Sequence, residues 1–158
     1  MSSLVLSSKG KVVEEIQCLI ADILQHRGRD TIVAFHPRAD STPTSLSVID
    51  QFVARNGLSA IGDQWREISR EAAVSLAATF LVRDLAYSVQ LMQDHMAREL
   101  ADRFVIVFSA DARFFTNTEY AAGASSWGWM PLTESTFDAG IVGADPSTIG
   151  VLVVQDED

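Results

Sequence analysis

The sequence contains a single cysteine, Cys18, among its 158 residues. No disulfide can therefore form within the chain, and neither a CxxC motif nor a Cys/His zinc site can be built. The chain also lacks a run of about 18 uninterrupted apolar residues, which a membrane-spanning helix would need. Its first residues form too short an apolar run, and become charged too early, for a secretory signal. These absences predict a cytoplasmic protein without a membrane span.

Basic residues are missing from the C-terminal third of the chain. Residues 114–158 contain seven carboxylates and no Lys or Arg, whereas residues 1–113 contain 12 basic and 14 acidic residues. The C-terminal third thus contributes −7 to the net charge of −9. A surface of this sign repels phosphate backbones, so direct binding to nucleic acid is not expected. Two readings stay open: the carboxylates keep the protein soluble, or they meet a basic partner.

Motifs for catalysis and for cofactor binding are also absent. The sequence has no HExxH, no GxSxG and no glycine-rich phosphate-binding loop. Its histidines, His26, His36 and His95, do not have the spacing of a metal site. Carboxylates at the end of a chain stay solvated and ionised, which does not suit general-acid catalysis. We therefore expect a protein that is not an enzyme and that uses no cofactor or metal.

Apolar periodicity predicts four helices. The clearest amphipathic segment spans residues 11–25, and it should end before Gly28, which can adopt the left-handed conformation of a C-cap. Shorter helices are expected at residues 46–56 and 94–102. Residues 69–88 are apolar on nearly all sides, which indicates a central helix that is buried on several sides.

Short β-prone runs should form a sheet. Residues 31–35, TIVAF, read as a buried strand, and residues 104–109, FVIVFS, as a strand buried on both faces. Residues 136–145 and 148–155 flank a turn at Pro146 and should form a β-hairpin. The predicted fold class is α+β, with N-terminal helices packed on a mainly antiparallel sheet that ends in this C-terminal hairpin. A single α+β domain is expected to span residues 1–158.

Four charged residues lie next to apolar segments. Arg83 and Asp84 belong to the predicted central helix, and Asp111 and Arg113 follow the predicted strand at 104–109. If this helix packs on the sheet, an Arg of one segment can pair with an Asp of the other in a buried polar network. The alternative is an anion-binding pocket that opens to solvent.

Two tryptophans, Trp127 and Trp129, flank Gly128 in a segment expected to be a loop. Tryptophan combines a large apolar area with little side-chain entropy and is enriched at the centres of protein interfaces. The pair can therefore anchor a partner, or it can close the end of the hydrophobic core. An intermediate arrangement gives one tryptophan to each role.

The C-terminal segments DARFFTN, WMPLTESTFDAGIV and IGVLVVQDED carry a resemblance to known proteins. A Trp followed by Pro-Leu-Thr, a Thr-Phe-Asp-x-Gly strand and an apolar strand ending in Asp-Glu-Asp together resemble the C-terminal region of small bacterial immunity proteins. Such proteins accompany contact-dependent growth inhibition and other polymorphic toxin systems. The resemblance implies a cytoplasmic inhibitor that binds one cognate toxin domain and blocks its active site or substrate surface.

Two functional hypotheses follow. The first is an immunity-type inhibitor of a basic, nuclease-like toxin domain, because carboxylates accelerate association with a basic surface. Its expected partner-binding residues are Glu119, Trp127, Trp129, Glu134, Asp138, Asp145, Asp156, Glu157 and Asp158. The second is a domain that binds a small molecule, anion or metal, conceivably an enzyme, with a site near Arg83, Asp84 and Arg113.

Overall fold

Five antiparallel strands form one sheet in the order β1-β5-β4-β3-β2. The computed structural model describes residues 2–39, 42–120 and 127–158, with side chains in the first helix described from Val12 onward. The strands are β1 (Ile32–Pro37), β2 (Arg66–Ile68), β3 (Arg113–Thr116), β4 (Phe137–Ala144) and β5 (Thr148–Asp156). The predicted α+β fold class and the C-terminal hairpin, formed by β4 and β5, are confirmed.

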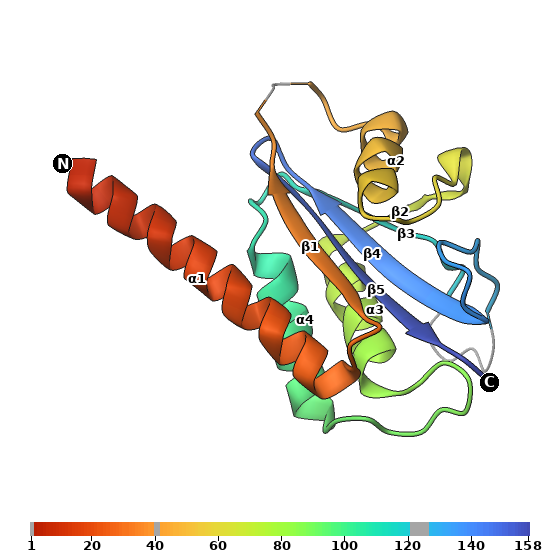
Figure 1. Cartoon of the computed structure of the whole chain (residues 1–158). Coiled ribbons are helices and arrows are strands. Elements are labelled where there is room, and N and C mark those ends of the chain that lie inside the picture. Colours follow the sequence, from red (N-terminus) through yellow and green to blue (C-terminus); the bar gives the residue numbers. More distant parts are fainter. Residues whose placement is uncertain (1, 40–41, 121–126) are drawn as a thin grey trace.

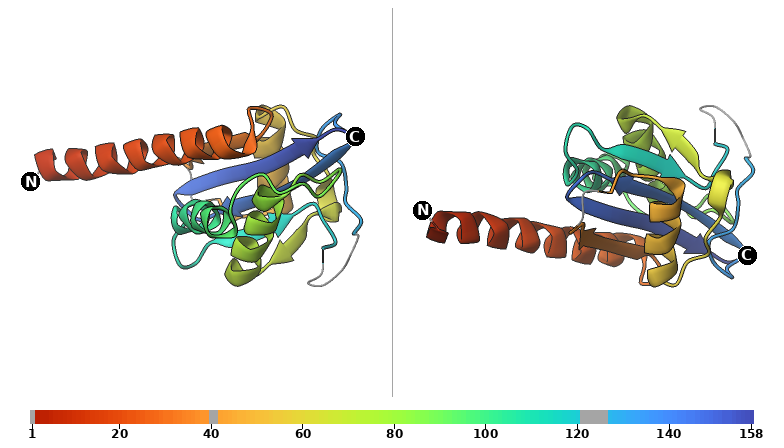
Figure 2. Two further views of the ribbon diagram at one scale, coloured as in Figure 1. Left: turned by 90° about the horizontal axis from the view of Figure 1, so that it is seen from below. Right: turned by 90° about the horizontal axis from the view of Figure 1, so that it is seen from above.

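Helices cover both faces of the sheet. They are α1 (Ser2–Arg27), α2 (Leu46–Arg55), the short 3-10 helix η1 (Gly62–Gln64), α3 (Arg70–Val82) and α4 (Asp94–Ile106). Figure 1 shows α1, α3 and α4 on one face and α2 on the other. The N-terminal half of α1 extends well past the rest of the molecule, as the two views of Figure 2 also show.

The central strands β4 and β5 carry the core on both of their faces. Ile141 of β4 and Leu152 of β5 pack toward α1, α3 and α4. Val142 and Val151, the next positions, pack toward α2. Successive side chains of a strand point to opposite faces, so a strand covered on both sides is apolar at nearly every position. This explains the continuous apolar run at the C-terminus.

The predicted strand at residues 104–109 is wrong. α4 continues to Ile106, so Phe104 and Val105 lie in its last turn and are buried. The buried apolar residues of this region recur at helical spacing, at positions Ala97, Leu100, Ala101, Phe104, Val105 and Phe108. The helical period therefore overrides the β-prone composition of FVIVFS.

The side chain of Phe108 enters the core above two glycines that face each other across the hairpin, Gly143 of β4 and Gly150 of β5. A Cβ atom at Gly143 would lie 2.8 Å from the Phe108 ring, and one at Gly150 would lie 2.6 Å from the Phe35 ring. These glycines leave the space in which the aromatic rings pack directly on the sheet. Phe108 contacts Phe35 and Phe114 with ring centroids 5.9 and 5.7 Å apart.

The remaining helix boundaries follow the sequence signals in part. α1 ends as expected, because Gly28 adopts a φ of 120° and donates its N–H to the Leu24 carbonyl. It begins earlier than expected, at Ser2. α3 ends at Val82 rather than at residue 88, and the residues up to α4 form a loop. The short strands β2 and β3 were not predicted.

Candidate functional site

The start of β4 and the ends of β3 and β5 lie together at one end of the sheet. Asp156 of β5 pairs across the ladder with Phe137 of β4, and Thr118, just after β3, bridges to Trp129. Figure 1 shows this end near the C-terminus. We call it the acidic end, defined by residues 117–119, 127–138 and 155–158. It contains Glu119, Trp127, Trp129, Glu134, Asp138, Asp156, Glu157 and Asp158.

Asp138 lies in the interior of the acidic end and is only 2% exposed. Its carboxylate accepts hydrogen bonds from the backbone N–H groups of Leu132 and Thr133, from the Thr133 hydroxyl and from the Asn117 amide, at 2.8–3.1 Å. These hydrogen bonds hold residues 132–133, which follow Trp129, against Asp138 of β4. The structure thus corrects the expectation that Asp138 binds a partner, because its carboxylate is buried and satisfied within the chain.

Asp145 is also buried, and it lies at the opposite end of the sheet, in the β4–β5 turn. Burial alone would raise the pKa of Asp145, but hydrogen bonds from the backbone N–H groups of Ser109, Ser147 and Thr148 outweigh it and hold the pKa below its ordinary value. Its role is to close the hairpin and tie it to the segment after α4. The expectation that Asp145 is a partner-binding residue is corrected for the same reason as for Asp138.

Asp156 forms a buried ion pair with Arg27, the last residue of α1, at 2.6 Å. The two side chains are 13% and 3% exposed. The Arg27 guanidinium also donates to the carbonyls of Phe80 and Arg83, and Asp156 accepts the backbone N–H of Leu85. This cluster joins α1, the end of α3 and β5. Asp156 is therefore part of the scaffold and is separate from the exposed tail that follows it.

Four carboxylates remain exposed at the acidic end: Glu119, Glu134, Glu157 and Asp158. The hydroxyl of Thr136 donates a hydrogen bond to Glu157 at 2.6 Å and holds its pKa below the ordinary value, so Glu157 is ionised at neutral pH. Besides Arg27, which pairs with Asp156, the basic residues Arg66 and Arg83 border the acidic end, and each donates to a backbone carbonyl: Arg66 to Thr118 and Arg83 to Ser88.

The two tryptophans have different neighbours, and both are half-buried. Trp127 packs against the core on the α1, α3 and α4 face and stacks edge-to-face on Tyr120, with ring centroids 4.8 Å apart. Trp129 lies over Phe137, with ring centroids 5.6 Å apart. Trp127 thus closes one edge of the core, whereas Trp129 packs on Phe137, and both keep part of their surface open to solvent.

The loop that follows α3 presents apolar side chains that sequence reasoning missed. Tyr87 is 66% exposed and Val89 57% exposed. The Asp84 carboxylate accepts the backbone N–H groups of Ala86, Tyr87 and Val89, and Ser88 adopts a left-handed φ of 57°. Burial would raise the pKa of Asp84, but these hydrogen bonds hold it below the ordinary value. The loop therefore has a fixed shape, and its contact with Asp156 through the Leu85 N–H places it beside the acidic end.

The four residues of the predicted polar network do not come together. Asp84 organises the loop after α3, whereas Arg113 lies at the far end of β4, opposite Ala144. Arg113 pairs with Glu67 of β2 at 2.8 Å and donates to the Thr44 carbonyl. Its guanidinium lowers the pKa of Glu67, and Glu67 in turn raises the pKa of Arg113. The expected buried network is thereby corrected: the partners of Arg113 are on β2 and before α2.

Arg83 and Asp111, the other two members, are exposed. Arg83 donates to the Ser88 carbonyl within its own loop, and Asp111 accepts the hydroxyl of Ser109. Within the described residues, no hydrogen bond or ion pair links either of them to Arg113. A ligand site built jointly from Arg83, Asp84 and Arg113 is therefore not assembled.

A hollow beside α2, of about 540 Å³, has a basic lining that includes Arg38 and Arg55. The Arg38 guanidinium already donates to the Thr44 hydroxyl and to the carbonyls of Thr42 and Asp145. It thus holds the segment before α2 against the hairpin turn. Arg55 likewise donates to the Gln51 carbonyl of its own helix.

Among the described residues, no cluster of three or more His, Cys, Asp or Glu side chains could hold a metal ion. No helix in this part of the chain combines the length and apolar character needed to cross a bilayer. Comparison of the chain with protein-family models, with curated proteins and with solved structures yields no match. The features of the molecule that bear on function are therefore the acidic end and the loop beside it.

Proposed function

We propose that the protein is an immunity-type inhibitor, which binds a basic, nuclease-like toxin domain through its acidic end and neutralises it in the cytoplasm. The observation that carries the proposal is the position of the exposed carboxylates beside a rigid apolar loop. Glu134, Glu157 and Asp158 supply charge, and Tyr87 and Val89 supply apolar area. A charged rim around an aromatic anchor is the usual arrangement of a specific protein interface.

The two sets of residues contribute different parts of binding. Exposed carboxylates attract a basic partner over a distance and raise the association rate, while they add little to the lifetime of the complex. The backbone of the loop at residues 83–90 is already ordered by Asp84, so it loses little conformational entropy on binding. Trp129, half-buried over Phe137, extends the same surface.

Inhibition follows from the position of the bound protein. A nuclease domain holds phosphates with Lys and Arg, and an acidic surface competes with the substrate for those same groups.

The single thiol, Cys18, is free and exposed, which fits a reducing compartment.

The first test is co-expression with the product of the reading frame immediately upstream. We expect that product to be toxic alone, to be tolerated in the presence of this protein, and to be retained by it in a pull-down. A product that is neither toxic nor bound overturns the proposal.

A second test locates the surface by changing charge at two sites. The triple variant Glu119→Gln, Glu134→Gln, Asp158→Asn removes three exposed carboxylates of the acidic end. A matched control removes three exposed carboxylates away from the acidic end, with Glu99→Gln, Asp102→Asn and Asp111→Asn.

Both triple variants change the net charge equally, so only the location of the charge differs. We expect the acidic-end variant to lower the association rate about tenfold at low salt and the control to leave it nearly unchanged. The difference should fade at high salt, because salt screens exposed charges. Equal effects in both variants would show that net charge, and not the acidic end, governs association.

A further inference from the structure

The apolar face with which α1 packs on the rest of the protein continues toward the N-terminus, where it becomes exposed. Leu19 and Ile23 are buried and Ile16 is half-buried, but Val12, one turn further toward the N-terminus, is 50% exposed. Positions 12, 16, 19 and 23 fall on one face of a helix. Figures 1 and 2 show why this face becomes exposed: α1 extends past the end of α4. Among the described residues, no element covers this apolar surface, which is suited to helix packing.

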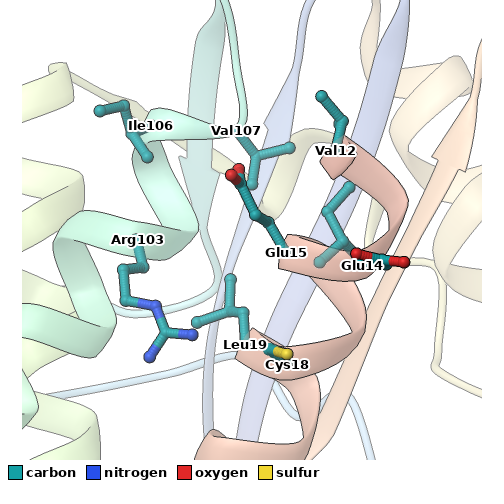
Figure 3. Close-up of a pocket in the computed structure, with 9 residues that line it drawn as sticks. Val12, Glu14, Glu15, Cys18, Leu19, Arg103, Ile106 and Val107 are labelled. Atoms are coloured by element: carbon teal, nitrogen blue, oxygen red, sulfur yellow. The ribbon is translucent and has the colours of Figure 1, made fainter. Parts of the chain in front are cut away.

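The end of α4 adds further exposed aliphatic surface at the same place. Ile106, in the last turn of α4, is 79% exposed, and with Val107 it lines the α4 side of a groove of about 560 Å³, whose α1 side includes Val12 and Leu19 (Figure 3).

The order of basic and acidic residues along α1 near the groove favours a second copy of this chain as the partner. Glu14 and Glu15 line the groove on α1. In the sequence, Lys9 and Lys11 precede Val12, and Glu14 and Glu15 follow Val13, giving KGKVVEE. An antiparallel pair of such segments brings the basic part of one next to the acidic part of the other. Two-fold symmetric dimers use one surface patch against itself in this way.

We propose that the protein forms a two-fold symmetric dimer in which two α1 helices pair antiparallel about Val12 and Val13, each filling the α1/α4 groove of the other copy. With the symmetry axis near residues 12 and 13, residue 11 of one copy faces residue 14 of the second, and residues 5–9 face 16–20. The second copy thus supplies a helix that covers Val12, Ile16 and Ile106.

This proposal is independent of the proposed inhibitory function. Arg27, at the other end of α1, lies beside the acidic end through its pairing with Asp156. Val12 precedes Arg27 by 15 residues, or about 22 Å of helix at 1.5 Å per residue, so the symmetry axis lies far from the acidic end. In the antiparallel register, residue 2 of the second copy faces residue 23, so the helix of the second copy ends four residues, or about 6 Å, before Arg27. The two proposals are tested by different variants, and either can fail without the other.

The mass of the protein in solution tests the dimer. We expect sedimentation equilibrium to show a mass that rises from monomer toward dimer between about 5 and 500 μM, since a small helical contact gives a weak complex. The double variant Val12→Glu, Ile106→Glu should remain monomeric over this range. Both residues are half or more exposed, so the fold should persist, as thermal unfolding will show.

A matched control places the same change on an equally exposed apolar residue, Val89→Glu, in the loop beside the acidic end. We expect this variant to dimerise as the parent does. A parent protein that stays monomeric at all concentrations overturns the proposal, as does a double variant that dimerises normally. Equal loss of dimer in Val89→Glu also overturns it, because the contact would then lie elsewhere.

Crosslinking tests the antiparallel arrangement. In a Cys18→Ser background, Val12→Cys lies next to the symmetry axis and should give a disulfide-linked dimer under mild oxidation. Gln17→Cys, also exposed on α1 but on another side of the helix, should not. Crosslinking that is equal at both positions contradicts the arrangement. Binding of a basic amphipathic peptide by a protein that stays monomeric would identify a different occupant and overturn the dimer.

Discussion

The buried ion pair between Arg27 and Asp156 predicts a large loss of stability when Asp156 loses its charge. Two exposed carboxylates follow Asp156 directly, so an adjacent residue can serve as the control. The Arg27 side chain is 3% exposed and directs its guanidinium to Asp156 and to two backbone carbonyls. Asp156→Asn removes the negative charge but keeps a carbonyl oxygen that can still accept the Leu85 N–H. The variant therefore isolates the cost of leaving the Arg27 charge without its counter-ion.

Breaking a buried ion pair by removing one partner costs about 3–5 kcal/mol. The total stability of a folded domain is about 5–15 kcal/mol, so this is a large fraction. At about 2–4 °C per kcal/mol for a chain of this length, Tm should fall by roughly 6–20 °C. Circular dichroism during heating and urea unfolding will measure the change.

Glu157→Gln is the matched control, one residue along the chain, since Glu157 is exposed and bonded only to nearby polar groups. We expect this variant to leave Tm and the urea midpoint nearly unchanged, as for exposed charged groups. A loss below about 1 kcal/mol in Asp156→Asn, or equal losses in the two variants, would refute the reasoning. Asp156 would then be part of the exposed tail in energetic terms, despite its position.

Three further predictions concern the scaffold. Gly143→Ala should lower stability by about 1–3 kcal/mol in urea unfolding, because its Cβ would lie 2.8 Å from the Phe108 ring; unchanged stability would show that the ring moves freely. Asp138→Asn should cost about 2–4 kcal/mol, because an amide cannot accept all the N–H donors that now face the carboxylate; tryptophan fluorescence should report the loosened segment around Trp129. The folded-state pKa of Asp145 is depressed, so its contribution to stability is present above the ordinary value of 3.8 and is lost as pH falls below it; Asp145→Asn should therefore flatten the acid limb of the stability curve, and an unaltered limb would contradict this.

The sequence was sufficient for the fold class and the hairpin because these depend on patterns within short segments. The run from residue 148 to the C-terminus could be read as a buried strand from its apolar residues alone. The FVIVFS segment was misread, since β-branched and aromatic residues favour strands, while the buried positions Phe104, Val105 and Phe108 repeat at the helical period. Counting that period together with Ala97 and Leu100 would have extended the helix correctly.

The candidate site was harder to predict, since the role of a carboxylate depends on contacts distant in sequence. Asp156 and Asp158 are alike in the sequence, yet one pairs with Arg27 and the other is exposed. Only the antiparallel pairing of β1 with β5 brings the end of α1 to the C-terminus. The exposed loop at Tyr87 could not be predicted for a related reason. Its apolar residues continue the helical pattern of α3, but backbone N–H groups of the loop bond to the Asp84 side chain and Ser88 adopts a left-handed φ, so the helix ends earlier.

The order of strands also determines when this protein can fold. Of the five described strands, the two central ones, β4 and β5, are synthesised last, and β1 pairs with β5, with Ile32 opposite Val153. During translation, β1 therefore lacks its partner strand β5, and α3 lacks the two central strands on which it packs. The complete sheet can therefore form only once β4 and β5 have been synthesised, and contacts so distant in sequence make folding slow. A chain truncated before β4 should aggregate and not form a partial domain, because its apolar surfaces stay exposed. Interrupted synthesis would therefore yield aggregating fragments.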